Sequence, residues 1–215
     1  MNRYKFKDLI VFEIDNYILI NKPAQVASLH ERIGIAASIV QLSKQYHEDA
    51  QLCHRLDKET TGIMAIAKHP EAYRNLAIQF EKRKVKKKYH AFSKGVHDFK
   101  DLKIDVALAV TAKGVAKVNR EKGKDSVTVA NTLRAFKNHS LIECQPLTGR
   151  LHQIRIHLSY CKAPLVADLQ YGGEYLYLSQ IKRKKFNLKW GAEEQPLMQR
   201  VALHAHSLAF TDVDG

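Results

Sequence analysis

The chain has 215 residues, 45% hydrophobic and 27% charged, which favours one globular domain. No apolar run reaches the length of a membrane span, and the polar start "NRYKFKD" does not look like a signal peptide, so we expect a cytoplasmic protein without a membrane partner. Three widely spaced cysteines without a CxxC pair argue against a disulfide framework and a zinc ribbon.

The net charge of +13, from 35 Lys and Arg against 22 Asp and Glu, favours a polyanionic partner such as nucleic acid. Basic residues gather in "EKRKVKKKYH" (Glu81–His90) and "IKRKKFNLKW" (Ile181–Trp190), where aromatic residues stand among them. Such segments can neutralise phosphates and stack on bases. The alternative is a solvated helix end followed by a loop.

Hydrophobic patterns predict the order of the structural elements. The predicted strands lie at 17–23, 63–67, 89–96, 126–136, 140–147 and 201–210, and the predicted helices at 35–49, 70–83 and 151–162. Strands and helices mix without a regular βα repeat, so we predict an α+β fold around a mixed, mainly antiparallel sheet flanked by helices and loops. The whole of 1–215 forms one domain in this interpretation. The final Asp-Gly pair is a hairpin signal, so we expect a last C-terminal strand to be missing.

Several predicted elements have an apolar face, which we expect to form core contacts in the first helix. In the first helix it consists of Ile35, Ile39, Leu42 and Tyr46; in the second helix, of Tyr73, Leu76, Ala77 and Phe80; in the strand at 126–136, of Val127, Val129 and Leu133. Pro70 suits the first turn of the second helix.

Asp57 is the first candidate for a catalytic residue. It lies in "CHRLDKETTG" between Arg55 and Lys58, directly before a strand that reads as buried. A surface ion pair is the plain interpretation. The alternative is a catalytic carboxylate on a loop, oriented by hydrogen bonds from Thr60 and Thr61. A lone carboxylate kept ionised by an arginine would serve as nucleophile or base.

The second candidate is "TGRLHQIRIH" (Thr148–His157), where a turn at Gly149 leads into a helix. Its donors are Arg150, His152, Gln153, Arg155 and His157. Helix starts with arginines suit phosphate or carboxylate groups, and five donors exceed what capping needs. A metal site is not expected, because no HExxH occurs and His204 and His206 lack a third ligand.

The ordered set of motifs resembles the RluA-type family of pseudouridine synthases. It comprises "INKPA", "HRLDKETTG" with "IAK" after it, "KKYHA", and "TGRLHQIRIHL" followed by "PLVADLQYGG". The resemblance runs from about Asp15 to Phe210. It implies the pseudouridine synthase fold and an isomerase that acts on uridine in RNA without a cofactor or metal. The RNA would be rRNA or tRNA, with the uridine in a loop or weakly paired region.

The resemblance also implies roles for single residues. Asp57 is the essential carboxylate, Tyr89 stacks on the uracil, and Arg155 forms an ion pair with Asp57. Arg55 contacts the RNA stack that the base leaves, and the other expected substrate-binding residues are His54, Arg150, His152 and Gln153. Departures from the family pattern occur at Thr61, Leu151 and Ala167, where the family usually has Ser, Thr or Ser, and Gly.

The family's S4-type RNA-binding domain has no room before residue 15, so we expect the catalytic domain itself to bind RNA, as a monomer that needs no protein partner. Two other functions stay open: an RNA-binding protein without chemistry, and a nuclease that uses its histidines. The choice among attack by Asp57 at C1′, attack at C6 and abstraction of a ribose proton is also open.

Overall fold

A computed structural model describes residues 4–30, 37–112, 114–182, 186–189 and 191–215. Its strands are β1 (Ile10–Glu13), β2 (Tyr17–Lys22), β3 (Gln51–Leu52), β4 (Thr61–Ala67), β5 (Lys86–Lys94), β6 (Leu102–Asp105), β7 (Leu108–Val110), β8 (Ala116–Val118), β9 (Val127–Ala135), β10 (His139–Pro146) and β11 (Leu203–Ala209). The helices are α1 (Ile39–Tyr46), α2 (Pro70–Glu81), α3 (Gln153–Tyr160) and α4 (Leu178–Ile181), with 3₁₀ turns η1 (Phe6–Leu9) and η2 (Leu169–Tyr171).

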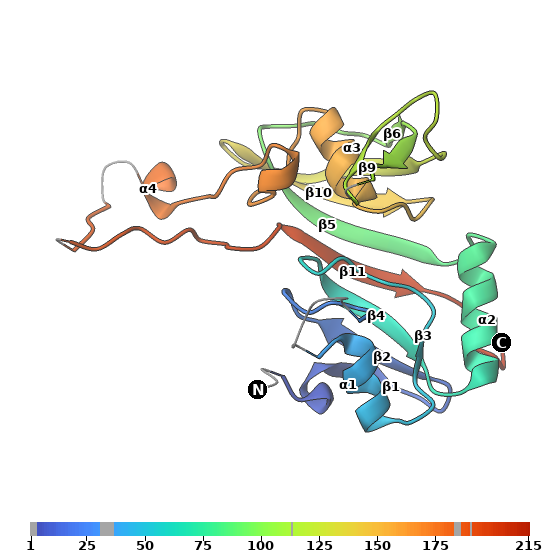
Figure 1. Ribbon diagram of the computed structural model, residues 1–215. Coiled ribbons are helices and arrows are strands. Elements are labelled where there is room, and N and C mark those ends of the chain that lie inside the picture. Colours follow the sequence, from blue (N-terminus) through green and yellow to red (C-terminus); the bar gives the residue numbers. More distant parts are fainter. Residues whose placement is uncertain (1–3, 31–36, 113, 183–185, 190) are drawn as a thin grey trace.

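One sheet organises the molecule (Figure 1). Its strand order is β1-β2-β4-β11-β5-β10-β9-β6, with β3 added beside β4, while β7 and β8 form a separate hairpin. Among the strand pairs of the described ranges, only β4 and β11 run parallel. The predicted α+β class with a mixed, mainly antiparallel sheet is therefore confirmed.

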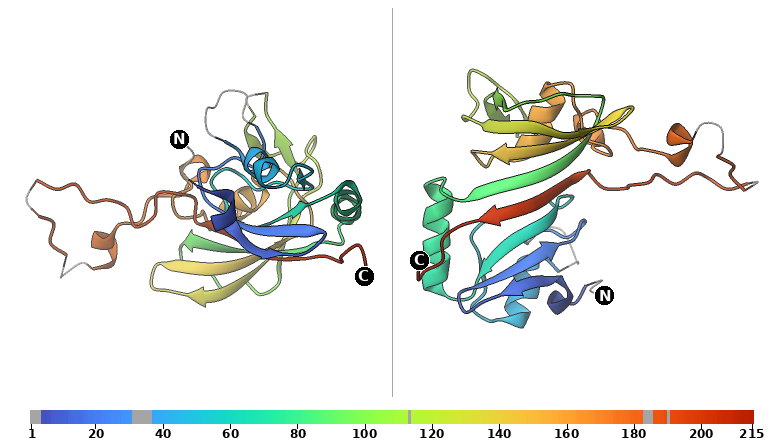
Figure 2. Two further views of the ribbon diagram at one scale, coloured as in Figure 1. Left: turned by 90° about the horizontal axis from the view of Figure 1, so that it is seen from below. Right: turned by 180° about the vertical axis from the view of Figure 1, so that it is seen from behind.

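Two hydrophobic clusters cover one face of this sheet. The first joins Ile154 and Leu158 of α3 to the β5–β10 half, and the second joins Ile39 and Leu42 of α1 to the β2–β4 half. Tyr89, in the middle of β5, packs against both clusters. In Figure 2 (left) α1 and α3 lie on the same side of the sheet. A third cluster packs α2 against the sheet through Tyr17, Ala65 and Ala67.

All six predicted strands and three predicted helices exist, but two of the apolar faces do not coincide with the buried faces. The buried residues of α2 are Ala72, Leu76 and Gln79, whereas Tyr73 is 37% exposed. In β9 the inward face carries Thr128 and Ala130 rather than the valines, and Leu133 is 48% exposed. Thr128 can be buried in β9 because its hydroxyl has hydrogen-bond partners. The hydroxyl accepts a hydrogen bond from the Gln153 amide, and a second hydrogen bond joins it to His157.

Other expectations have mixed outcomes. In α1, Ile39 and Leu42 are buried as predicted, Tyr46 lies at the surface, and Ile35 falls outside the described residues. Pro70 is in the first turn of α2, as predicted. The sequence interpretation missed β1, β3, β6, the β7–β8 hairpin and α4. None of the helices in the described ranges has the length and apolarity that a bilayer crossing needs.

The described residues between Gly172 and Ala202, which include α4, extend away from the sheet as a long arm (Figure 1, orange to red). A backbone hydrogen bond from Leu197 to Leu176 joins its two limbs, with an N···O distance of 2.8 Å. Four residues of the second basic cluster, Arg183, Lys184, Lys185 and Trp190, lie outside the described residues, so the prediction for that cluster is untested.

Gly62 allows β11 to lie directly beside the end of the Asp57 loop. Its φ is +114°, and a Cβ there would lie 2.2 Å from the carbonyl oxygen of Ala205. Ala205 is the register partner of Gly62 on one side and of Tyr89 on the other. This close approach sets the spacing between the Asp57 loop and the Tyr89 strand.

Candidate active site

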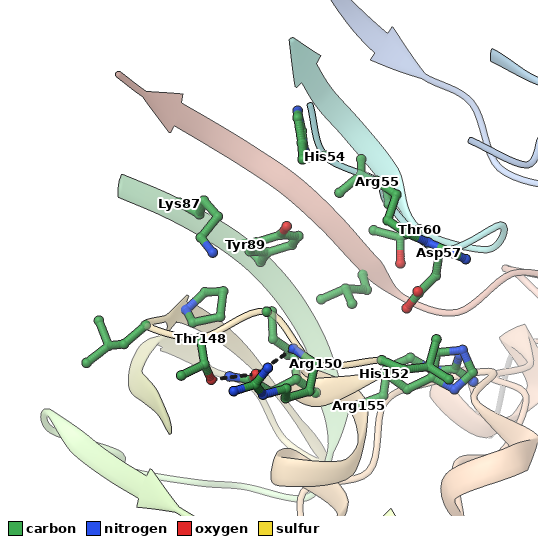
Figure 3. A pocket seen from close by; sticks show the side chains of 18 of the residues that line it. His54, Arg55, Asp57, Thr60, Lys87, Tyr89, Thr148, Arg150, His152 and Arg155 are labelled. Atoms are coloured by element: carbon green, nitrogen blue, oxygen red, sulfur yellow. Dashed lines mark hydrogen bonds between the residues drawn. The ribbon is translucent and has the colours of Figure 1, made fainter. Parts of the chain in front are cut away.

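A cavity of about 610 Å³ lies over the middle of the sheet (Figure 3). Its wall comes from the loop between β3 and β4, the end of α2 with the residues after it, the inner face of β5, residues 146–155, which lead into α3, and Leu203 of β11. The structure brings all eight residues selected from the sequence to this cavity: Asp57, Arg155, Tyr89, Arg55, His54, Arg150, His152 and Gln153. The three motifs that carry them are far apart in the chain, so their convergence is the main structural support for a common site.

The backbone on both sides of Asp57 is held by hydrogen bonds. The Ser28 hydroxyl donates to the Leu56 carbonyl at 2.7 Å and accepts from the Leu56 N–H at 3.1 Å. The carbonyl of Lys58 accepts from the Gln25 N–H at 2.9 Å. Asp57 is therefore presented by a loop that is fixed at the residue before it and at the residue after it.

Lys22 contributes to the same anchoring. Its side chain is fully buried, and its ammonium donates to the carbonyls of Pro23, Val26 and Lys58 at 2.8–3.2 Å. Burial lowers the pKa of this ammonium to about 8, although the charges of Asp57 and Glu59 oppose the shift. Lys22 lies in the motif "INKPA" at the end of an apolar strand, and no role was predicted for it from the sequence.

The Asp57 carboxylate itself is available to a ligand. Within the described ranges it forms no ion pair and accepts no hydrogen bond, and Figure 3 shows it reaching toward the segment that carries His152 and Arg155. The predicted support from Thr60 is present only in the backbone, where its N–H donates to the Asp57 carbonyl at 3.1 Å, and neither the Thr60 nor the Thr61 hydroxyl bonds the carboxylate. The Thr61 hydroxyl bonds His204 at 2.8 Å, and the buried Thr60 hydroxyl, at the cavity wall, has no partner.

Arg155 has a different partner from the one predicted. Its guanidinium donates Nε–H to one oxygen of Asp168 at 2.8 Å and Nη2–H to the other at 2.7 Å, and both side chains are at most 5% exposed. Arg155 and Asp57 form no ion pair in the described part of the chain. A buried guanidinium needs a matching acceptor, and Asp168 supplies the bidentate geometry.

The charge of Asp57 nevertheless acts on Arg155. Burial opposes the charged guanidinium, but the hydrogen bonds and charge of Asp168, with a contribution from Asp57, raise the pKa of Arg155 overall. Asp168 follows Ala167, whose φ of +60° is in the left-handed region. Alanine pays a steric cost in this conformation that glycine avoids, and this is the position at which the family pattern has glycine.

His152 precedes α3 in a left-handed conformation, with φ 53° and ψ 23°. Its Nδ1 lies 2.8 Å from the hydroxyl of Tyr171, whose ring also stacks under the Arg155 guanidinium at 4.9 Å. Burial lowers the pKa of His152, and Asp57 is the charge that opposes this shift most. The ring is therefore neutral near pH 7 and lies at the cavity wall.

Tyr89 provides the aromatic surface of the cavity. Its side chain lines the same cavity as Asp57 and lies in Figure 3 between the loop that carries Arg55 and the segment that carries Arg150. Burial, followed by the negative charge of Asp57, raises the pKa of the Tyr89 phenol, so the hydroxyl stays protonated.

Three of the candidate site residues already have hydrogen-bond partners within the protein. Gln153 uses its amide oxygen for Thr148 and the Arg150 N–H, and its amide nitrogen for Val127 and Thr128. His157 is fully buried between Thr128 and the Val106 carbonyl. These two residues hold the loop and α3 in place instead of contacting a ligand.

His54 is the third of these occupied residues. Its Nε2 accepts the Ala65 N–H at 3.0 Å, and its ring stacks on Phe80 with centroids 4.6 Å apart. This nitrogen must be unprotonated to accept, and burial lowers the pKa of His54 to about 3. His54 therefore lines the cavity as a neutral wall and a brace for the Asp57 loop.

Cations dominate the rest of the wall. Arg55, Arg83, Lys87 and Arg150 line the cavity, against the carboxylates of Asp57 and Glu81. Only Lys87 of the basic run 86–88 faces inward, because it shares the inner face of β5 with Tyr89, while Lys88 pairs with Glu143 on the outer face. In the described residues, no three His, Cys, Asp or Glu side chains are arranged to hold a metal ion.

A cationic cavity with one open carboxylate and one aromatic platform is typical of enzymes that modify a base in a nucleic acid. The chain belongs to the RNA pseudouridylate synthase family, whose model matches residues 16–160. This confirms the resemblance recognised in the sequence.

Curated relatives cover nearly all of the chain. It is 34% identical over 212 residues to ribosomal large subunit pseudouridine synthase C of Buchnera aphidicola subsp. Baizongia pistaciae, covering 95% of this chain and 63% of the relative. It is 35% identical over 213 residues to ribosomal large subunit pseudouridine synthase D of Neisseria meningitidis serogroup B, covering 94% and 54%. The chain thus spans just over half to under two thirds of these relatives.

The fold is shared with solved structures. Human RNA pseudouridylate synthase domain containing 1 matches with a TM-score of 0.72 and 25% identity, covering all of this chain and 83% of that one. Human RNA pseudouridylate synthase domain containing 4 matches with a TM-score of 0.70 and 26% identity, covering 94% and 85%.

Proposed function

We propose that this chain is an RNA pseudouridine synthase, which converts uridine in RNA to pseudouridine without a cofactor. The observation that carries the proposal is the open Asp57 carboxylate in one cavity with the Tyr89 ring, on a loop fixed at Leu56 and Lys58. Family membership and the names of the relatives support it.

The reaction is an isomerisation, so atoms balance within the uridine. The bond between N1 and C1′ breaks, the uracil turns, C5 bonds to C1′, C5 loses its proton to solvent, and N1 gains one. The aromatic surface of Tyr89 would hold the free base while it turns, because stacking tolerates rotation in the ring plane. Asp57 would act at the ribose or at C6, and the positive charge of Arg155, held by Asp168, would attract its carboxylate.

Ribosomal RNA is the first substrate to test, since the relatives are named for the large ribosomal subunit, and tRNA is the second. The target uridine would lie in a loop or weakly paired region, where extrusion costs least. Arg55 and Arg150, at the cavity wall, would contact the RNA around it. We further propose a cytoplasmic monomer that needs no protein partner.

The test is tritium release from RNA labelled at uridine C5. We expect release from rRNA or tRNA transcripts with the wild-type chain and none with Asp57→Asn, while RNA affinity stays within about tenfold because a negative charge is removed from a cationic site. RNA length should be unchanged on a denaturing gel. RNA binding without tritium release would instead indicate a binding protein, and shortened RNA would indicate a nuclease.

A further inference from the structure

The hydrogen bonds around Tyr171 define which nitrogen of His152 carries the proton. The Tyr171 hydroxyl lies 3.2 Å from the carbonyl oxygen of Ala116, which can only accept, and 2.8 Å from His152 Nδ1. The hydroxyl has one proton. Both bonds form together only if Tyr171 donates to Ala116 and accepts from an Nδ1–H of His152. A neutral His152 then has an unprotonated Nε2.

This Nε2 has no hydrogen-bond partner among the described residues. The unpaired side-chain nitrogen and oxygen atoms that are buried in those ranges belong to His47 and Thr60, so the unpaired Nε2 of His152 is accessible to solvent. The ring lines the cavity, and Asp57 is the charge that acts on it most strongly. The chain places it there at a steric cost, since a non-glycine residue in the left-handed region is strained. The site thus contains a fixed hydrogen-bond acceptor next to its carboxylate.

The substrate offers few groups that such an acceptor can bind. A uridine within an RNA chain has two hydrogen-bond donors, the base N3–H and the ribose 2′-hydroxyl. The carboxylate must reach the glycosidic carbon C1′ or its neighbourhood, and the 2′-hydroxyl is attached to the adjacent carbon, whereas N3 lies across the ring. An acceptor beside Asp57 therefore meets the ribose.

We propose that His152 Nε2 accepts a hydrogen bond from the 2′-hydroxyl of the target ribose and thereby selects RNA over DNA. The 2′-hydroxyl is the group by which a protein distinguishes the two at a given nucleotide. Tyr171 acts through His152, because it holds the tautomer in which Nε2 is free to accept. This inference rests on the proposed function, whose substrate it specifies.

The binding experiment uses an RNA that the wild-type chain modifies, with uridine or 2′-deoxyuridine at the target. All affinities are measured in the Asp57→Asn background, so that nothing is converted. We expect deoxyuridine to bind roughly 3- to 10-fold more weakly, the value of one hydrogen bond. The same replacement one nucleotide away controls for sugar pucker and should have no comparable effect.

Two variants isolate the acceptor. His152→Asn keeps a polar group near the position of Nδ1 but lacks one at the position of Nε2, and asparagine tolerates the left-handed backbone. The ratio of its affinities for RNA with uridine and with 2′-deoxyuridine at the target, the ribose preference, should therefore fall to about 1. His152→Gln places an amide oxygen near Nε2 and should recover part of the preference. A wild-type preference in His152→Asn, or equal loss in both variants, would overturn the proposal.

A second readout needs no RNA. Nitrogen NMR of the histidine rings in the free protein should show His152 neutral and protonated on Nδ1, and Tyr171→Phe should mix the two tautomers. An Nε2–H tautomer in the wild-type chain would reject the inference by itself. Absence of tritium release from any RNA would reject the proposed function instead, so the two failures are distinguishable.

Discussion

Lys87 is expected to contact a phosphate of the bound RNA, and its removal should change the salt dependence of binding. Its side chain lines the cavity two residues before Tyr89 on the same face of β5, and in the described ranges no carboxylate lies within ion-pair distance of it. Burial, with the nearby charge of Arg83, lowers the pKa of Lys87. A partly desolvated ammonium without an acidic partner is suited to an anionic ligand.

The magnitude follows from counterion release. One lost phosphate contact on single-stranded RNA should reduce the slope of log K against log salt by about 0.7. When salt rises from 50 to 200 mM, the affinity for RNA falls in both proteins. The factor by which it falls should be roughly 2.5-fold smaller for Lys87→Met than for the wild type. The free protein should be equally stable or more stable by about 1 kcal/mol, because an unpaired charge leaves the wall.

The assay is RNA binding by fluorescence anisotropy over a salt series, with thermal unfolding in parallel. Lys86→Met is the matched control, since Lys86 lies next to Lys87 but is exposed on the opposite face of β5. Equal slopes for the two variants would refute the assignment of Lys87 to a phosphate.

Four further expectations follow from the site. Asp168→Asn should destabilise the protein by about 3 kcal/mol in denaturant unfolding, because it leaves the buried Arg155 unpaired, and a fully stable variant would contradict this. His54 should make the free energy of unfolding depend on pH: its folded pKa of about 3 lies below its unfolded value, so its contribution is complete above pH 6.5 and is lost as pH falls toward 3, by at most about 1.4 kcal/mol per unit. The difference in pH slope between wild type and His54→Gln measures it, and parallel curves would exclude it. Tyr89→Phe should retain most tritium release and Tyr89→Ala little, whereas equal loss would assign the role to the hydroxyl. Thr60→Val should raise stability by about 1 kcal/mol, because it removes an unpaired buried hydroxyl, and unchanged or lower stability would show that the hydroxyl is satisfied.

The sequence was sufficient for the class of fold and for the residues of the cavity wall, because both depend on local signals. Alternation and helical spacing located β2, β4, β5, β9, β10, β11 and three helices. The motifs around Asp57, Tyr89 and Arg155 identified the site, although each comes from a separate part of the chain.

The sequence was insufficient for hydrogen-bond partners across the fold. Arg155 has two candidate acidic partners, Asp57 and Asp168. Only the packing of the segment after α3 places Asp168 at hydrogen-bond distance. Ser28 has no distinguishing pattern, yet it fixes the residue before Asp57. The inward face of β9 did not follow from its apolar residues. It carries Thr128, a polar residue whose burial depends on a hydrogen bond from Gln153 in α3 that the sequence does not show.

β11 comes last among the strands of the described sheet but lies in the middle of it (Figure 1). The units on either side, residues 10–67 and 86–146, are built from strands close in sequence, so each can pair early during synthesis. Asp57 belongs to the first unit and Tyr89 to the second, and Ala205 of β11 is the register partner that joins them. The carboxylate and its aromatic platform therefore come together only after β11 has left the ribosome, and a nascent chain cannot assemble the cavity before Leu203–Ala209 are available for pairing.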